Sequence, residues 1–373
     1  MDQSGINNIS FPLQPHPVTL RKVTTISHTS ESIQHNTSSP LAPLHVAYSP
    51  DYLQWQLGSG DGSHPTNPIR AELATEMLVE ELGDAVSVID PATADMKHVR
   101  AAIESIHDLD YVSAVIDDGV SDEWMRNKTW MGQTAATMFA GTQMLVEGMI
   151  KGAFTVGFNP QGAKHHAHFS HSSGFCVFND MAWAAVEFHN AGLKPLYLDW
   201  DIHAGDGVQH LLEGTSIPTL SIHNHSIYPG DPETINRELS RAGKNHSAHD
   251  EERHIYNWGI NNGAGDEVLL GLLNGEIEEV VKRYKPDVIL LAAGADGHGG
   301  TSNLGSSNNY TYEGFTQAAK KVAEWANTYS QGRVLIGGAG GYQPLDHTPR
   351  IWANVVETIY TETVQKRSAQ EAK

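Results

Sequence analysis

Cysteine is almost absent from this chain, which has one residue of this type, Cys176, among 373. A single cysteine excludes an intrachain disulfide and fits a reducing compartment, so we expect a cytoplasmic protein. No apolar run approaches the length of a membrane span, and the first residues lack the basic and apolar regions of a signal peptide. We therefore expect neither membrane insertion nor secretion.

Positive charge is also scarce. The chain has 24 Lys+Arg against 44 Asp+Glu, a net charge of −20. A nucleic-acid-binding surface needs basic side chains to meet phosphate, so we expect no nucleic-acid partner. An acidic field favours the approach of cationic substrates, although the same charge also serves solubility alone. Composition leaves a homo-oligomer open.

Internal repeats and interdomain linkers are absent after the first segment. Residues 1–44 are rich in Ser, Thr, Asn, Gln, His and Pro, which predicts a polar N-terminal arm, partly disordered, with a short edge strand near Val18–Leu20 and Val23–Ile26. Residues 45–373 are expected to form one domain.

Apolar strands alternate with amphipathic helices from His45 onward, which indicates a mainly parallel sheet with helices on both faces. The expected strands are Val46–Tyr48, Val86–Ile89, Phe154–Phe158, Leu196–Asp199, Thr219–His223, Val288–Ala292 and Val334–Ile336. The expected helices are Pro68–Leu82, Trp130–Ile150, Asn179–Asn190, Asp266–Tyr284, Tyr312–Tyr329 and Pro349–Thr363.

Polar motifs follow four of these strands. Asp199-Trp200-Asp201-Ile202-His203 ends one apolar run, and period-two alternation places Asp199, Asp201 and His203 on one side. The other three motifs are His165-His166-Ala167 with Ser173-Gly174-Phe175-Cys176 after it, Gly294-Ala295-Asp296, and Gly340-Gly341-Tyr342. Ligands bind at the carboxyl ends of strands in open α/β sheets, so these motifs are expected to meet there.

Three of these side chains suit a zinc ion, namely Asp201, His203 and Asp296. Two carboxylates nearly neutralise the dication, so the site needs a further electrophile and a base. The tandem histidines and Tyr342 are reasonable suppliers. Asp199 and Asp206 remain as carboxylates able to orient a histidine and raise its basicity.

Taken in order, the four motifs resemble the histone deacetylase family, which includes bacterial histone-deacetylase-like amidohydrolases and acetylpolyamine amidohydrolases. The resemblance covers residues 45–352. It implies an arginase-like α/β fold and one catalytic zinc held by Asp201, His203 and Asp296. It also implies hydrolysis of an N-acyl amide, whether acetyl-lysine, an acetylpolyamine or a small-molecule amide.

The same resemblance assigns roles to the remaining site residues. His166 would be the general base and then acid, with Asp206 as its partner, and His165 would lie beside the attacking water, paired with Asp199. Tyr342 would donate to the scissile carbonyl. The substrate pocket would be lined by Gly174, Phe175 and Tyr228. A structural potassium site would be formed by Asp199, Asp201, His203 and Ser221.

Departures from the family pattern fall around the pocket. Ala204 replaces a histidine, Lys164 replaces an apolar residue, and His168 and His171 replace residues that are more often lysine and acidic. No acidic residue near positions 121–127 clearly matches the one that grips a peptide backbone. The substrate, its acyl chain and the choice of zinc over iron or cobalt therefore stay open.

Two other functions are compatible with some of these residues. A binuclear manganese ureohydrolase of the same fold would need a second Asp/His-rich motif, and the sequence offers one Asp-x-His set with a third Asp. A catalytically silent protein that binds acyl amines would retain the pocket alone, which the complete set of ligands, base and tyrosine disfavours.

Overall fold

A nine-stranded β-sheet is the centre of the computed structural model, which describes residues 43–58, 64–124, 127–230, 247–300 and 308–365. The strand order is β2-β1-β3-β9-β8-β4-β5-β7-β6. The strands are β1 Leu44–Ala47, β2 Val86–Ile89, β3 Val156–Asn159, β4 Pro195–Asp199, β5 Thr219–Asn224, β6 Ser247–Asp250, β7 Ile255–Ile260, β8 Val288–Ala292 and β9 Val334–Gly337.

Every neighbouring pair of strands is parallel except β6 and β7. The central strands β3, β4, β8 and β9 are buried at every residue, which explains their nearly continuous apolar sequences. The antiparallel strand β6 lies at the sheet edge and has the polar sequence Ser-Ala-His-Asp. The predicted fold, a mainly parallel sheet, is confirmed.

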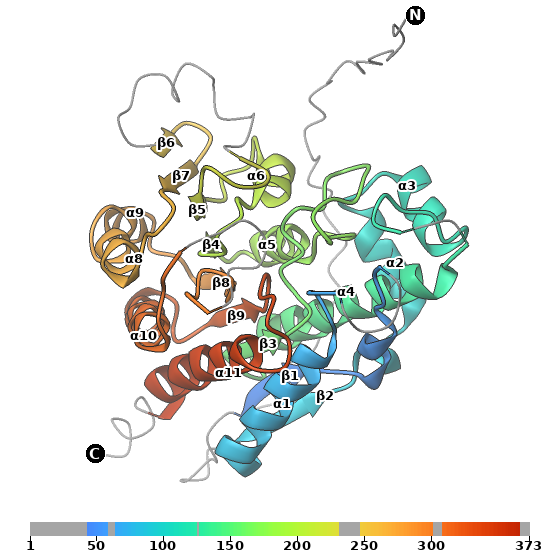
Figure 1. The fold of residues 1–373 in the computed structure, drawn as a ribbon, viewed down its shortest axis with the longest axis horizontal. Coiled ribbons are helices and arrows are strands. Elements are labelled where there is room, and N and C mark those ends of the chain that lie inside the picture. Colours follow the sequence, from blue (N-terminus) through green and yellow to red (C-terminus); the bar gives the residue numbers. More distant parts are fainter. Residues whose placement is uncertain (1–42, 59–63, 125–126, 231–246, 301–307, 366–373) are drawn as a thin grey trace, which may run out of the picture.

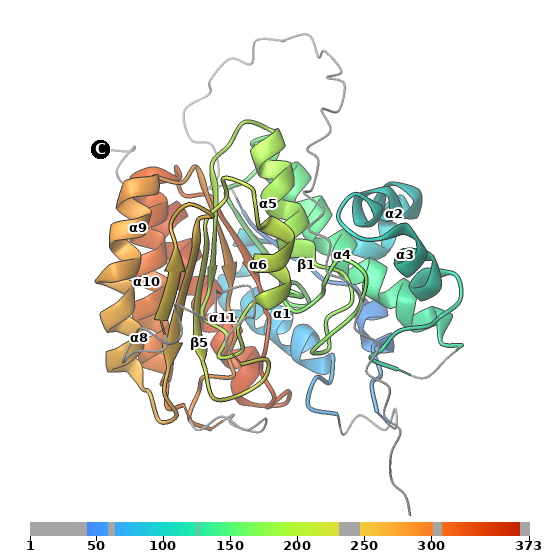
Figure 2. The same ribbon diagram turned by 90° about the horizontal axis from the view of Figure 1, so that it is seen from above.

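Helices cover both faces of the sheet (Figures 1 and 2). One face carries α1 Ile69–Leu82, α8 Asp266–Leu273, α9 Glu276–Tyr284, α10 Tyr312–Tyr329 and α11 His347–Tyr360. The other carries α4 Thr129–Ile150, α5 Asp180–Asn190 and α6 Asp206–Leu212, with α2 Met96–Glu104 and α3 Leu109–Ile116 packed outside α4. Two hydrophobic cores result, one on each side of the sheet.

All seven predicted strands are present, with ends that differ by two residues at most. The predicted helix Asp266–Tyr284 is wrong as one element, because it divides into α8 and α9 at Asn274 and Gly275. Strands β6 and β7 and helices α2, α3 and α6 were not predicted. The predicted arm, including the edge strand at Val18–Ile26, lies outside the described residues except for its last two positions.

The carboxyl ends of the central strands are aligned. Asn159, Gly337, Ala292, Asp199 and Ser221 pair in register across β3, β9, β8, β4 and β5. One of the four polar motifs begins in this row, at Asp199, and the other three begin a few residues beyond it. The register of the sheet therefore brings segments separated by up to about 180 residues along the chain to one edge.

A buried histidine ties the helical layer to the loop that carries the tandem histidines. His107, between α2 and α3, has Nδ1 2.9 Å from the His168 carbonyl oxygen, and its Nε2 accepts a hydrogen bond from the Asn179 amide at 2.9 Å. Because Nε2 accepts, the ring is neutral. Burial lowers the pKa of His107 from 6.5 to about 4.

Acidification should destabilise the fold through His107. The unfolded chain takes up a proton at this histidine near pH 6.5 and the folded chain only near pH 4, so its stabilising contribution is complete above pH 6.5 and is lost as the pH falls between these values. Between pH 7.5 and 5 we expect a loss of about 2 kcal/mol from this group. Denaturant titrations of wild type and His107→Gln would check this, and parallel pH dependences would contradict it.

Candidate metal and catalytic site

Asp201, His203 and Asp296 form a buried group at the carboxyl edge of the sheet. Their ligand atoms all lie within 4.8 Å of one another. Nδ1 of His203 is 3.0 Å from Oδ1 of Asp201 and 2.8 Å from Oδ2 of Asp296. The structure thus brings together the three residues predicted as metal ligands. Among the described residues, no other group of three or more His, Cys, Asp or Glu side chains has this geometry.

Backbone turns after β4 aim the first two of these side chains. β4 ends at Asp199, as predicted, so Asp201 and His203 lie on the loop that follows its carboxyl end. The Asp201 amide donates to Oδ1 of Asp199 at 3.0 Å, and the His203 amide donates to Oδ1 of Asp201 at 2.9 Å. These two turns, each closed by an aspartate side chain, continue the alternation of the strand beyond its end. Asp201 and His203 face the site, while Trp200 and Ile202 pack into the apolar core.

The electrostatics of this group favour a cation. Burial opposes the charging of His203, but its hydrogen bonds to Asp201 and Asp296 outweigh burial and raise its pKa to about 10. Burial and the charge of Asp201 raise the pKa of Asp296 to about 7. Two convergent carboxylates therefore stabilise positive charge between them. Three nitrogen and oxygen ligands also match the number of protein ligands in catalytic zinc sites, so the residues fit zinc.

Gly340 packs directly against the ligands, with its amide donating to Oδ2 of Asp201 at 2.6 Å. A methyl group at this position would lie 2.5 Å from the same oxygen, and Asp296 would be as close. We expect Gly340→Ala to weaken zinc binding by about 10- to 100-fold, as loss of supporting contacts does. Zinc competition with a chromophoric chelator would measure this.

Gly271→Ala is the matched control for Gly340→Ala. Gly271 lies in α8, where an added methyl would meet nothing within 4 Å. We expect Gly271→Ala to bind zinc like the wild type. Equal zinc affinity in the Gly340→Ala variant would show that the loop can move away from the carboxylates at little cost.

His165 is paired with a buried carboxylate. Its Nδ1 lies 2.8 Å from Oδ2 of Asp199, and that oxygen also accepts a hydrogen bond from the Tyr197 hydroxyl at 2.6 Å. Burial disfavours the charged form of His165, but Asp199 and then Asp201 outweigh it and raise its pKa to about 9. His165 is therefore protonated at neutral pH.

His166 has the opposite protonation state. Burial and the charge of His165 lower its pKa to about 4, against the influence of Asp206. Its Nδ1 donates to Oδ1 of Asp206 at 2.7 Å, since a carboxylate can only accept, and Nε2 is left as an acceptor. The second oxygen of Asp206 lies 3.2 Å from Nε2 of His168. A neutral, oriented imidazole beside a charged one is suited to accept a proton.

Tyr342 completes a narrow cavity with the two histidines. The cavity has a volume of about 20 Å³, and its other lining residues include Arg70, Lys164, Phe175 and Gly340. The Tyr342 ring lies 5.9 Å from the His203 ring, between centroids. Burial, followed by the charges of Asp296 and Asp201, holds the pKa of Tyr342 well above its usual range. Its hydroxyl therefore keeps the proton that a donor needs.

The predicted substrate-pocket residues gather beside His166. Gly174 and Phe175 adopt positive φ values of 53° and 65°, and the Tyr228 ring is 5.1 Å from the His166 ring. An added methyl at Gly174 would clash with the His166 ring. Tyr228 is 49% exposed, which places it at the end of the predicted pocket that faces the surface. Cys176 is buried, and burial raises the pKa of its thiol to about 12, which is poor for a nucleophile.

The residues predicted to bind potassium lie on adjoining segments. Asp199 and Ser221 are paired across β4 and β5. The Ser221 hydroxyl, however, lies 3.0 Å from Nδ1 of His223, and the Asp199 carboxylate is engaged by His165, Tyr197 and the Asp201 amide.

Three residues of the site had no predicted role. Tyr197 supports Asp199, as described above. Asp180 accepts hydrogen bonds from the amides of Ala163 and Lys164 at 3.0 and 2.8 Å, and so fixes the segment before the tandem histidines. Arg70 lines the cavity from the first turn of α1. Asp180 lies at the start of the predicted helix Asn179–Asn190, where its side chain had no predicted partner, and Arg70 and Tyr197 carry no local motif.

The sequence of this chain matches a known protein family. The histone deacetylase domain model matches residues 64–359. The chain belongs to the histone deacetylase family. It is accordingly a hydrolase of that family with a candidate metal site, and its buried Asp–His–Asp group is consistent with the family's zinc site. Membership implies an acetylated amine as the substrate.

Individual members of the histone deacetylase family resemble the chain over most of its length. Acetoin utilization protein AcuC of Staphylococcus aureus (strain MRSA252) is 27% identical over 353 residues, covering 87% of this chain and 84% of that protein. Histone deacetylase 8 of Xenopus tropicalis is 28% identical over 339 residues, covering 87% and 85%. The HDA15 HD domain has the same fold, with a TM-score of 0.69 and 20% identity over 85% of this chain and 88% of that chain.

The sequence also predicted that the chain does not insert into a membrane. None of the helices in the described part of this family member combines the length and apolar character that crossing a bilayer requires.

Proposed function

We propose that this protein is a zinc-dependent amidohydrolase that releases the acyl group from an acylated amine. The observation that carries the proposal is the cavity where His165, His166 and the Tyr342 phenol meet beside the Asp201–His203–Asp296 group. The substrate classes considered are acetyl-lysine, an acetylpolyamine and a small-molecule amide.

The side chains divide the reaction between them. When bound, zinc supplies a Lewis acid that polarises the acyl carbonyl and lowers the pKa of water. His166 accepts the proton of the attacking water at Nε2 and returns it to the leaving amine nitrogen as the C–N bond breaks. Tyr342 donates a hydrogen bond to the carbonyl oxygen as it gains negative charge. Asp206 and Asp199 keep His166 and His165 oriented.

The pairing of carboxylates with histidines also supports distinct roles for the tandem residues. Protonated His165, beside Asp199, is suited to donate a hydrogen bond and not to accept a proton. Neutral His166 is suited to act as the base. The potassium site at Asp199, Asp201, His203 and Ser221 remains a prediction, supported by the adjacency of β4 and β5.

Metal content and turnover together test the proposed function. We expect chelation to abolish turnover and one equivalent of zinc to restore it, measured on acetyl-lysine peptide, acetylputrescine, acetylspermidine and an acetyl anilide. Iron and cobalt reconstitution would identify the most effective metal. No turnover at full zinc occupancy would favour a silent binding protein, and a requirement for two equivalents of manganese would favour a binuclear ureohydrolase.

A further inference from the structure

Two cationic side chains line the catalytic cavity, together with Tyr342 and the tandem histidines. Arg70 reaches it from α1, and Lys164 directly precedes His165. Arg70 is only 3% exposed, and its Nη1 donates to the Gly341 carbonyl oxygen at 2.5 Å. Its Nε is buried without a hydrogen-bond partner among the described residues. The guanidinium therefore retains an unused donor.

Lys164 is similarly short of acceptors. Its Nζ donates to Oε1 of Gln161 at 3.3 Å and lies 5.8 Å from the centre of the Trp55 ring. Nε2 of Gln161 is a further buried donor without a partner in the described part of the chain. Burial lowers the pKa of Lys164 to about 8, and the positive charge of Arg70 acts in the same direction.

Neither cation forms an ion pair with a carboxylate among the residues that the structure describes. A buried guanidinium beside a partly buried ammonium, with unpaired donors at Arg70 Nε and Gln161 Nε2, is costly unless an anion binds there. Guanidinium and ammonium groups both form strong, charge-assisted hydrogen bonds to carboxylates. The carboxylates of Asp201 and Asp296 are directed to the candidate metal site and so do not serve this purpose.

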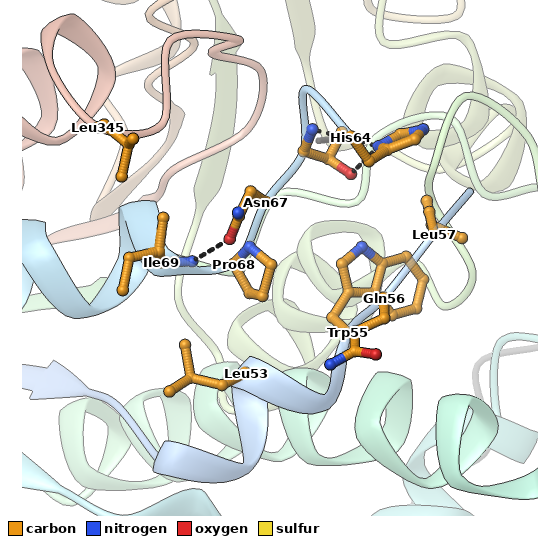
Figure 3. Close-up of a pocket in the computed structure, with 10 residues that line it drawn as sticks. Leu53, Trp55, Gln56, Leu57, His64, Asn67, Pro68, Ile69 and Leu345 are labelled. Carbon is orange, nitrogen blue, oxygen red and sulfur yellow. Dashed lines mark hydrogen bonds between the residues drawn. The ribbon is translucent and has the colours of Figure 1, made fainter. Parts of the chain in front are cut away.

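A larger cavity adjoins this cationic part of the site. It has a volume of about 260 Å³, and Thr66 lines both cavities. Figure 3 shows Leu345 and Ile69 on one side of the larger cavity and Trp55, His64 and Leu57 on the other. Trp55 is also the ring that Lys164 overlies, so the ammonium group lies near the boundary between the two cavities. Thr66, the residue shared by the two cavities, marks the direction in which an acyl chain longer than acetyl would extend past Tyr342 toward Lys164.

We propose that Arg70 and Lys164 bind the distal carboxylate of a short dicarboxylic acyl group, so that succinyl or glutaryl amines are preferred substrates. The inference rests on the proposed function and names its substrate class. Water adds its oxygen to the acyl carbon, the C–N bond breaks, and the amine leaves with a proton. The released product is the dicarboxylic acid. Arg70 and Lys164 act as specificity residues in this reaction.

The experiment compares substrates that differ in one charge. Zinc-loaded wild type and Lys164→Met would be assayed on a lysine reporter carrying acetyl, butyryl, succinyl or succinamyl groups. The succinamyl group is nearly isosteric with succinyl but ends in a neutral amide. We expect wild type to favour succinyl over succinamyl in kcat/KM by about tenfold or more, and Lys164→Met to reduce that ratio by about tenfold. Lys151→Met, at a surface lysine whose side chain is 73% exposed, should keep the wild-type ratio.

The ratio is taken within each protein, so differences in folding or zinc content cancel. A wild-type ratio at or below one, or a ratio unchanged in Lys164→Met, would overturn the proposal. Altered inhibition by free acetate, without any change in succinyl preference, would show that the cations hold a released monocarboxylate and would overturn it too. No turnover of any acyl amine would instead overturn the proposed function, and the substrate class with it.

Discussion

Replacing His166 with glutamine is expected to lower kcat about 100- to 10,000-fold, the usual contribution of a positioned general base. The substitution removes Nε2, the one acceptor that the His166–Asp206 hydrogen bond leaves available. Zinc binding should be unchanged, because His166 does not belong to the Asp201–His203–Asp296 group. Steady-state kinetics on the best acyl substrate, with zinc content measured on the same samples, would test the expectation.

His98→Gln is a suitable control for the His166 variant. The His98 side chain is 65% exposed and pairs with Glu147 on the surface. We expect its kinetics and zinc content to match the wild type. Full amidase activity in His166→Gln with one zinc per chain would assign the base to another residue, and His165 would be the first to examine.

Tyr342→Phe is expected to lower kcat by about 100- to 1,000-fold, the typical cost of removing one donor to a developing oxyanion. Burial and then the charges of Asp296 and Asp201 hold the pKa of the phenol well above its usual range, so the hydroxyl keeps its proton at neutral pH. KM should change much less than kcat, because the hydrogen bond strengthens as the carbonyl oxygen becomes charged.

Tyr310→Phe offers a matched buried control. The Tyr310 hydroxyl has no hydrogen-bond partner within the described residues, and burial, followed by the charge of Asp296, raises the pKa of this phenol. Removing this hydroxyl should leave kcat within about twofold of wild type, because no hydrogen bond is lost. If Tyr342→Phe retained full activity, the assignment of Tyr342 as the electrophile would be wrong.

Local sequence patterns predicted most of the sheet and its covering helices. Strands such as β8, with sequence Val-Ile-Leu-Leu-Ala, are apolar throughout because both of their faces are buried. The edge strand β6 could not be recognised, since its sequence Ser-Ala-His-Asp is short and polar and shows little alternation, although it pairs with β7 across a turn of residues 251–254. Strand order likewise depends on contacts between distant segments, which periodicity does not contain.

The candidate metal ligands were predictable because each lies in a short motif that follows a strand. The meeting of Arg70 and Lys164 in one cavity was not predictable, because Arg70 occupies the first turn of an ordinary helix 94 residues before Lys164. Lys164 was recognised only as a departure from the family pattern. Its meaning depends on the fold, which places it beside Arg70 in one cavity.

The register that aligns Asn159, Gly337, Ala292 and Asp199 also determines when the site can form during synthesis. β9 lies between β3 and β8 in the sheet. The strands on its two sides are therefore not joined until residues 334–337 have left the ribosome. Tyr342 and Gly340 follow only after that strand. A nascent chain that already carries Asp201 and His203 therefore lacks a complete place to hold the ion until β9 and the segment with Gly340 have been made, so we expect metal loading to be a late event in the maturation of this protein.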